Sequence, residues 1–164
     1  MKTLFLLRHA KSSWDDPGLA DFDRPLNGRG ERNAPMMGEL MRRKGFEPDV
    51  ILSSPAERAR GTAIAAKKAG GLDGKIAYDD RIYEASTNTL RKVVSEIDDT
   101  CKSAMLVGHN PGMEGFVRYL TGDDERMPTA ALAVIELDIK SWSKIAEGCC
   151  TLKKIFRPKE LTST

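Results

Sequence analysis

The architecture follows from Leu4-Phe5-Leu6-Leu7-Arg8-His9, an apolar run that ends directly in an arginine and a histidine. A second stretch, Ala104-Met105-Leu106-Val107-Gly108-His109, repeats this arrangement much later in the chain. Successive apolar residues of this kind are typical of a strand buried on both faces of an α/β sheet. In such sheets ligands collect outside the carboxyl ends of the strands. We therefore expect His9 and His109, the only two histidines of the chain, to belong to one site.

Other apolar patterns predict the remaining elements. Strands are expected at 49–53 and 75–78, with helices after Ser54, at 90–97 and at 113–120. Two strand-like runs near the end, 131–137 and 151–156, are joined by a connection containing Glu147-Gly148, which is typical of a hairpin. Together these patterns predict an α/β fold with a mixed, mostly parallel sheet.

A further helix is expected between Asn27 and Lys44-Gly45. Asn27 is a favourable N-cap, and Ala34 and Met37 begin an apolar pattern at helical spacing. Pro35 conflicts with this pattern because a proline removes a hydrogen bond from a helix interior. We therefore expect either a kink at Pro35 or a helix that starts later than Asn27.

A strand-to-helix corner at Ser53-Ser54-Pro55 places Arg58 in the first turn of the helix that follows. Helix N-termini offer unpaired N–H groups and a positive dipole end, so an arginine there adds to an anion site. On its own, Arg58 is more simply explained as a solvent-facing residue, and Arg8-His9 alone is a weak motif. Together, Arg8, His9, Arg58 and His109 predict phosphate binding and phosphoryl transfer.

Length and composition limit the number of domains, the partners and the location that the chain is expected to have. At 164 residues the chain is expected to form a single domain, 1–164, whose core needs no disulfides or metals. A net charge of +2, with interspersed basic and acidic residues, argues against a nucleic-acid partner. Three cysteines, an odd number without metal-ligand spacing, favour a reducing, cytoplasmic location. The first apolar run is too short for a signal peptide or membrane span, so no membrane partner is expected.

Four motifs occur together in this chain: Leu7-Arg8-His9-Ala10-Lys11-Ser12, Asp23-Arg24-Pro25-Leu26-Asn27, Ser53-Ser54-Pro55-Ala56 with Arg58 and Thr62, and Val107-Gly108-His109-Asn110-Pro111-Gly112. In this order and spacing they resemble the motifs of the histidine phosphatase superfamily. Within that superfamily the chain is similar to the short SixA-like phosphohistidine phosphatases. The likeness extends from Thr3 to Pro158, which would be the core of the domain.

The resemblance implies a phosphoglycerate mutase-like fold, a three-layer α/β/α sandwich around a mixed, mostly parallel sheet. It also implies that His9 is the nucleophile and becomes transiently phosphorylated. Arg8, Arg58 and His109 would hold the phosphoryl oxygens, with no metal and no cofactor. The expected activity is that of a metal-independent phosphatase acting on phosphohistidine in a protein domain. The alternative substrate within the superfamily is a small phosphorylated molecule.

The other candidate site residues have competing interpretations. Glu84 is the candidate proton donor, since it lies where larger members of the superfamily carry their acid, but it could be a solvated loop carboxylate. Ser12, Asn110 and Arg24 are candidate phosphate or substrate contacts. Ser12 and Asn110 could equally cap helices, and Arg24 could form a local ion pair in a turn with Asp23.

Two functions of other classes compete with that of a phosphatase. A metal-dependent hydrolase would use His9 and His109 with Asp15 or Asp23, but two histidines without a His-x-His cluster disfavour it. A noncatalytic module would bind phosphate with the same cluster, although arginines alone suffice for binding.

The absence of a long insertion that could close over a small metabolite favours, as the substrate, a phosphohistidine displayed on another protein.

Overall fold

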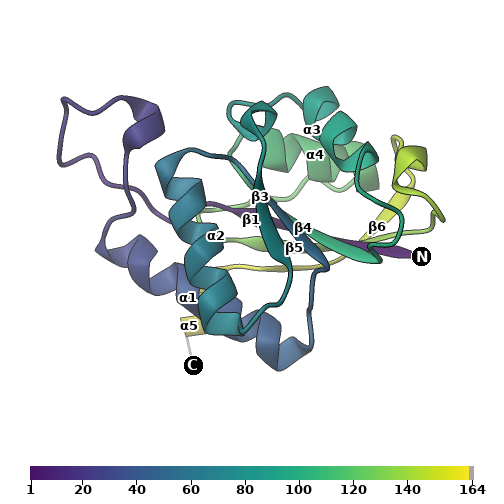
Figure 1. The fold of residues 1–164 in the computed structure, drawn as a ribbon, viewed down its shortest axis with the longest axis horizontal. Helices are drawn as coiled ribbons and strands as arrows, with labels where there is room; N and C mark the ends of the chain where they lie inside the picture. The colour runs from purple at the N-terminus through teal and green to yellow at the C-terminus, as the bar shows by residue number, and fades with distance from the viewer. Residues whose placement is uncertain (163–164) are drawn as a thin grey trace.

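The computed structural model describes residues 1–162 and contains one six-stranded sheet with helices on both faces (Figure 1). The strands are β1 (Lys2–Arg8), β2 (Val50–Ser53), β3 (Lys75–Tyr78), β4 (Ser103–Gly108), β5 (Leu132–Leu137) and β6 (Cys150–Phe156). The α-helices are α1 (Gly28–Lys44), α2 (Glu57–Gly70), α3 (Thr87–Ser95), α4 (Gly112–Thr121) and α5 (Pro158–Thr162). Short 3-10 turns occur at η1 (Asp21–Asp23), η2 (Asp80–Ile82) and η3 (Trp142–Lys144).

The strand order is β3-β2-β4-β1-β5-β6. The four strands from β3 to β1 pair in parallel, whereas β5 runs antiparallel to β1 and β6 runs antiparallel to β5. The hairpin expected near the end of the chain is therefore confirmed. The predicted three-layer α/β/α sandwich with a mixed, mostly parallel sheet is confirmed as well.

The central strand β1 explains why the sheet is covered on both faces. Successive side chains of a strand point to opposite faces, and those of Leu4 and Leu6 enter the cluster that contains Phe116 of α4. Phe5 and Leu7 enter the other cluster, to which α1 and α2 contribute. Because both faces of β1 are apolar, the sheet requires helices on each side.

Helix α1 begins immediately after its expected cap. The side-chain oxygen of Asn27 accepts a hydrogen bond from the N–H of Gly30 at 2.8 Å. The helix then continues through Pro35 to Lys44. Of the two expected alternatives, a start later than Asn27 is therefore wrong, whereas a kink at Pro35 stays a prediction.

Packing against α2 accounts for this outcome. A Cβ atom at Gly38 would collide with the carbonyl oxygen of Ala66, so the two helix backbones are in close contact. Met37 and Met41 are fully buried. Full burial of an apolar side chain of this size contributes about 1.5–3 kcal/mol. Two such contributions are comparable to or larger than the roughly 3 kcal/mol that a proline costs in a helix interior.

The parallel register brings three strand ends to one edge of the sheet. Arg8 at the end of β1 lies opposite Gly108 at the end of β4, and Ser53 of β2 lies opposite Val107. The residues that follow these positions therefore leave the sheet side by side. They include His9 and His109.

Candidate active site

The two histidines form the centre of the site. Their ring centroids lie 5.0 Å apart, with an angle of 49° between the ring planes. Both side chains are buried, although a hundred residues of sequence separate them. The register of β1 and β4 thus brings together the two residues that were expected to share a site.

One ring nitrogen of His9 is held by the backbone. Nδ1 lies 2.8 Å from the carbonyl oxygen of Ala10, and because a carbonyl only accepts hydrogen bonds, Nδ1 carries the proton. Burial, together with the positive groups around the ring, lowers the pKa of His9 to about 3. The imidazole is therefore neutral near pH 7, with its lone pair on Nε2. This is the form that can attack phosphorus.

His109 is oriented by Ser54. Its Nε2 lies 2.8 Å from Ser54 Oγ, and the same oxygen accepts the N–H of Ala56 at 3.2 Å. The hydroxyl proton of Ser54 can then be donated to Nε2, which leaves the proton of the neutral ring on Nδ1. Burial, and next the positive charge of Arg58, lower the pKa of His109 to about 4. Nδ1 is buried and has no partner within residues 1–162, so it is available to donate to an oxyanion.

Arg8 provides a second buried donor without a protein partner. Its Nη1 donates to the carbonyl oxygen of Met127 at 3.1 Å, while its Nε has no hydrogen bond to any described residue. Burial lowers the pKa of Arg8, and the nearby carboxylate of Glu114 opposes this shift. A buried donor without a partner costs about 1–3 kcal/mol. A bound phosphate would remove that cost.

Arg58 lies in the first turn of α2, as predicted, and its guanidinium group is bound by Asp21. Nη1 donates to the backbone carbonyl oxygen of Asp21 at 2.7 Å, and Nη2 donates to Asp21 Oδ2 at 2.9 Å. Thr62, one helical turn further along α2, donates to the Arg58 carbonyl at 2.7 Å and accepts the N–H of Ala10 at 2.9 Å. Thr62 thereby connects the helix that carries Arg58 to the segment that holds His9.

Asp21 is a site residue that the sequence analysis missed. Its Oδ1 accepts from Arg24 at 2.8 Å, and Oδ2 also accepts from the Tyr83 hydroxyl at 2.6 Å. The Tyr83 hydrogen bond is the largest cause that lowers the pKa of Asp21 to about 2, and the same bond raises the pKa of Tyr83 to about 12. The spacing Asp21–Arg24 was the only signal available, because residues three apart meet on a helical turn.

Arg24 is buried, but its acidic partner is Asp21 and not Asp23. The suggested local pairing with Asp23 is therefore wrong, since the 3-10 turn η1 brings the residue three positions earlier into reach. Arg24 also donates to Ser12 Oγ, and its guanidinium carbon lies 3.3 Å from the centre of the Trp14 ring.

These groups surround one small cavity of about 240 Å³. It is lined by Arg8, His9, Lys11, Ser12, Trp14, Arg24, Arg58, His109, Asn110 and Thr129. The lining thus combines three guanidinium groups with two neutral imidazoles. The guanidinium groups and His109 can donate to the oxygens of a phosphoryl group, while His9 presents a lone pair to the phosphorus.

Asn110 and Glu84 differ from the buried residues. The Asn110 amide donates to the Met127 carbonyl at 2.9 Å and accepts the N–H of Glu114 at 3.3 Å, so these bonds orient the loop. Glu84 is exposed, with a positive φ of 55°. It lines a second cavity of about 450 Å³ that shares Arg58, His109 and Asn110 with the first. Glu84 therefore stands beside the site, where a leaving group could lie.

Within residues 1–162, no group of three or more His, Cys, Asp or Glu side chains is arranged to hold a metal ion. A metal-dependent hydrolase based on His9, His109 and an aspartate therefore gains no support from the geometry. Independence of metals and cofactors stays a prediction.

Comparison with protein families agrees with this geometry. The model of the histidine phosphatase superfamily (branch 1) matches residues 4–110, which include most of β1, all of α1, α2 and β4, and both histidines. The chain belongs to the histidine phosphatase superfamily. Residues 111–162, which contain α4 and the antiparallel hairpin, lie beyond the matched region.

Relatives and solved structures extend the likeness over nearly all of the chain. An uncharacterized protein of Mycobacterium tuberculosis is 32% identical and covers 93% of this chain and 100% of its own length. A protein of Agrobacterium tumefaciens, provisionally assigned as the phosphohistidine phosphatase SixA, is 34% identical with a TM-score of 0.83, covering 96% of this chain and 98% of its own. The protein histidine phosphatase SixA in complex with tungstate has a TM-score of 0.81 at 21% identity, covering 98% and 99% of the two chains. At that identity, the last likeness shows the fold alone.

The depressed histidine pKa values predict a loss of stability in acid. In the folded protein they are about 3 and about 4, against an ordinary value of 6.5. Below about pH 6.5 the unfolded chain binds more protons than the folded chain, so the free energy of unfolding falls by at most about 1.4 kcal/mol per pH unit for each histidine. This contribution is fully present above about pH 6.5 and is lost as the pH falls toward about 4 for His109 and toward about 3 for His9.

Urea unfolding between pH 7.5 and 5 tests this expectation. Because the chain has no other histidine, a His9→Asn/His109→Asn double variant keeps every carboxylate and serves as the control. We expect its free energy of unfolding to fall less steeply with decreasing pH than that of the unaltered protein. Parallel curves for the two proteins would contradict the assigned neutral histidines.

Proposed function

We propose that this protein is a metal-independent phosphatase that removes the phosphoryl group from a phosphohistidine on another protein. The observation that carries the proposal is the His9 ring, which lies beside His109: its Nδ1 is held by the Ala10 carbonyl, and its Nε2 makes no hydrogen bond to any described residue. This arrangement suits a nucleophile and has no evident purpose in simple phosphate binding. Membership of the histidine phosphatase superfamily supports the proposal.

In the proposed first step, the lone pair of His9 Nε2 attacks phosphorus. The P–N bond to His9 forms while the bond to the leaving group breaks, and the leaving group departs with that electron pair. Arg8, Arg58 and the Nδ1–H of His109 stabilise the charge on the phosphoryl oxygens during this in-line transfer. In the second step, water attacks the phosphorus of phospho-His9. Inorganic phosphate is released and the neutral His9 ring is restored.

The need to protonate the leaving group favours a phosphoramidate over a phosphate ester as the substrate. An alkoxide needs a proton in the transition state, whereas a phosphohistidine whose ring is already protonated leaves as neutral imidazole. The one candidate acid, Glu84, is exposed and makes no hydrogen bond to any described residue. The structural likeness to a protein provisionally assigned as a phosphohistidine phosphatase supports the same substrate class.

The proposal is tested by measuring phosphate release from a histidine-phosphorylated protein domain and, in parallel, from an aryl phosphate, both with a chelator present. Chelator-resistant turnover of the phosphoprotein is the expected result. Turnover of the ester alone would assign a small-molecule phosphomonoesterase with the same nucleophile. No turnover of either substrate, with phosphate still bound, would assign a noncatalytic phosphate-binding module.

The role of Glu84 depends on the leaving group, so two substrates separate its possible roles. In Glu84→Gln we expect turnover of an alkyl phosphate to fall by about 10²-fold, the contribution of a general acid. Turnover of phosphohistidine is expected to stay unchanged. Steady-state kinetics on both substrates check this, with Asp80→Asn as an exposed-carboxylate control. An equal loss on both substrates would contradict the role of Glu84 as a general acid that only ester substrates need.

The location of the protein also stays a prediction. Over residues 1–162, no helix combines the length and the apolar character that crossing a bilayer requires. Cytoplasmic residence is proposed from the three free cysteines, Cys101, Cys149 and Cys150.

A further inference from the structure

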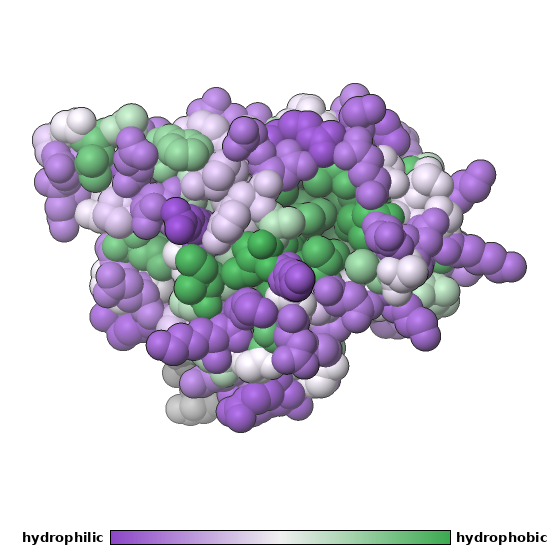
Figure 2. Space-filling view, viewed as in Figure 1, coloured by the Kyte–Doolittle hydropathy of each residue, from purple (hydrophilic) through white to green (hydrophobic). Residues whose placement is uncertain are grey.

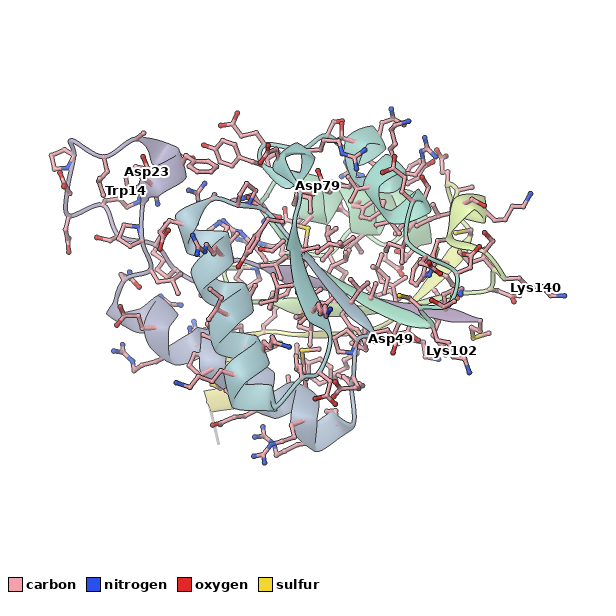
Figure 3. The ribbon with its side chains drawn as sticks, in the orientation of Figure 1. Trp14, Asp23, Asp49, Asp79, Lys102 and Lys140 are labelled. Carbon is pink, nitrogen blue, oxygen red and sulfur yellow. The ribbon has the colours of Figure 1, made fainter. Side chains whose placement is uncertain are left out.

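A projecting segment beside the phosphate cavity has an unusual surface. Residues 14–23, which we call the arm, leave the body of the molecule between β1 and α1 (Figure 1). Every residue of the arm is exposed. Trp14 and Asp23, labelled in Figure 3, both lie on it, away from the sheet.

The arm concentrates exposed apolar side chains. Trp14, Leu19 and Phe22 are 72%, 39% and 38% exposed, and they are three of the six large hydrophobic residues that the described part of the chain exposes. Figure 2 shows apolar atoms on this segment among hydrophilic ones. Aromatic and apolar side chains gathered on a protruding surface are typical of a protein-binding site.

The arm is held in a defined position although it is exposed. At its base, Ser13 N–H donates to the Pro25 carbonyl at 2.8 Å, and Trp14 stacks on the buried Arg24. Near its end, the ring of Phe22 packs edge-on against Tyr83 at 5.2 Å. A docking surface that is already ordered loses less conformational entropy when a partner binds.

Charge indicates which partner fits. The arm carries Asp15, Asp16, Asp21 and Asp23 and no basic residue. Asp21 is neutralised by Arg24 and Arg58, whereas the other three carboxylates form no ion pair with any described residue. The cavity beside them is lined by three arginines. A positive pocket next to a negative, partly apolar arm is complementary to a protein surface of a particular kind. On that surface, lysine or arginine and apolar side chains surround a phosphate group.

We propose that the arm is a docking surface for a folded protein domain whose phosphohistidine lies among basic and apolar side chains. This inference rests on the proposed function, since it names the partner of the same site. The cavity would receive the phosphoryl group while Trp14, Leu19 and Phe22 contact the apolar surface of the domain. Asp15, Asp16 and Asp23 would attract its basic residues and repel acidic partners.

The test compares two substrates of the same chemistry, a histidine-phosphorylated domain with a basic surface and free phosphohistidine. The variant is Asp15→Asn/Asp16→Asn/Leu19→Ala, which changes no residue of the phosphate cavity. We expect its kcat/KM on the domain to fall by about tenfold or more, because steering charges and contacts are lost. Its kcat/KM on free phosphohistidine is expected to stay unchanged, which also shows that the variant is folded.

A matched control removes the same kinds of group elsewhere. Asp138→Asn/Glu147→Gln/Ile64→Ala alters two exposed carboxylates and one exposed apolar residue outside the arm. This control is expected to keep full activity on both substrates. The difference between the unaltered protein and the arm variant should also shrink at high salt, since ions screen exposed charges.

Each other outcome overturns a specific claim. Equal kcat/KM of the arm variant and the unaltered protein on the domain would overturn the docking surface alone. Equal losses on both substrates would make the arm part of the catalytic site. If light scattering shows dimers that the arm variant abolishes, a second copy of the chain covers the surface and the proposal fails. No turnover of the domain by the unaltered protein would overturn the proposed function itself.

Discussion

His9→Ala is expected to reduce phosphatase turnover by at least about 10³-fold while the protein still binds phosphate, because the variant removes the group that forms the covalent intermediate. The anion-binding donors stay in place: Arg8, Arg58 and the Nδ1 of His109, which has no hydrogen-bond partner among residues 1–162. Turnover is measured by phosphate release and binding by calorimetry with inorganic phosphate. Trapping of an acid-labile phosphoenzyme in the unaltered protein, and its absence from the variant, would identify the phosphorylated residue directly.

The same variant permits a second check. Removing the ring leaves space beside His109, since the two ring centroids are only 5.0 Å apart. Added imidazole is therefore expected to restore part of the activity by acting as an external nucleophile. Activity of His9→Ala equal to that of the unaltered protein would refute the nucleophile. Loss of phosphate binding together with turnover would instead indicate that His9 holds the site together.

Arg58→Ala is the second change with a large expected effect. We expect kcat/KM to fall by about 10²–10³-fold, the cost of removing one donor that stabilises transition-state charge. The loss also leaves the carboxylate of Asp21 without its Arg58 partner next to an anionic substrate. Arg58→Lys should recover only part of the activity, because an ammonium group keeps the charge but cannot bind two oxygens as a fork. Initial rates on phosphohistidine measure both variants.

Arg60 provides the matched control on the same helix. Its side chain is exposed and its guanidinium carbon lies 5.7 Å from the centre of the Tyr78 ring, outside the phosphate cavity. Arg60→Ala removes the same charge from α2 and is expected to leave kcat/KM unchanged. If both variants lose activity equally, the net charge of the helix matters and the specific contact of Arg58 does not.

The fold could be predicted from local sequence patterns, because a strand that is buried on both faces consists of consecutive apolar residues. Leu4–Leu7 and Ala104–Val107 predicted central strands, and both are central in the sheet. Residues that directly follow parallel strands lie at the same edge of the sheet. The sequence therefore predicted that His9 and His109 lie close together. The prediction that Arg58 lies in the first turn of a helix is confirmed, because that position depends only on where the helix starts.

Partners that come from separate loops left no such pattern. Asp21 reaches Arg58 and Tyr83, 37 and 62 positions away, from an exposed segment without periodicity. Pro35 stays inside α1 because close packing on α2 outweighs a local preference. Which nitrogen of His9 carries the lone pair likewise depends on where one backbone carbonyl lies. Amino-acid order thus specified the strands and the residue types at their ends, whereas tertiary contacts chose hydrogen-bond partners, because those depend on loop positions that no short stretch encodes.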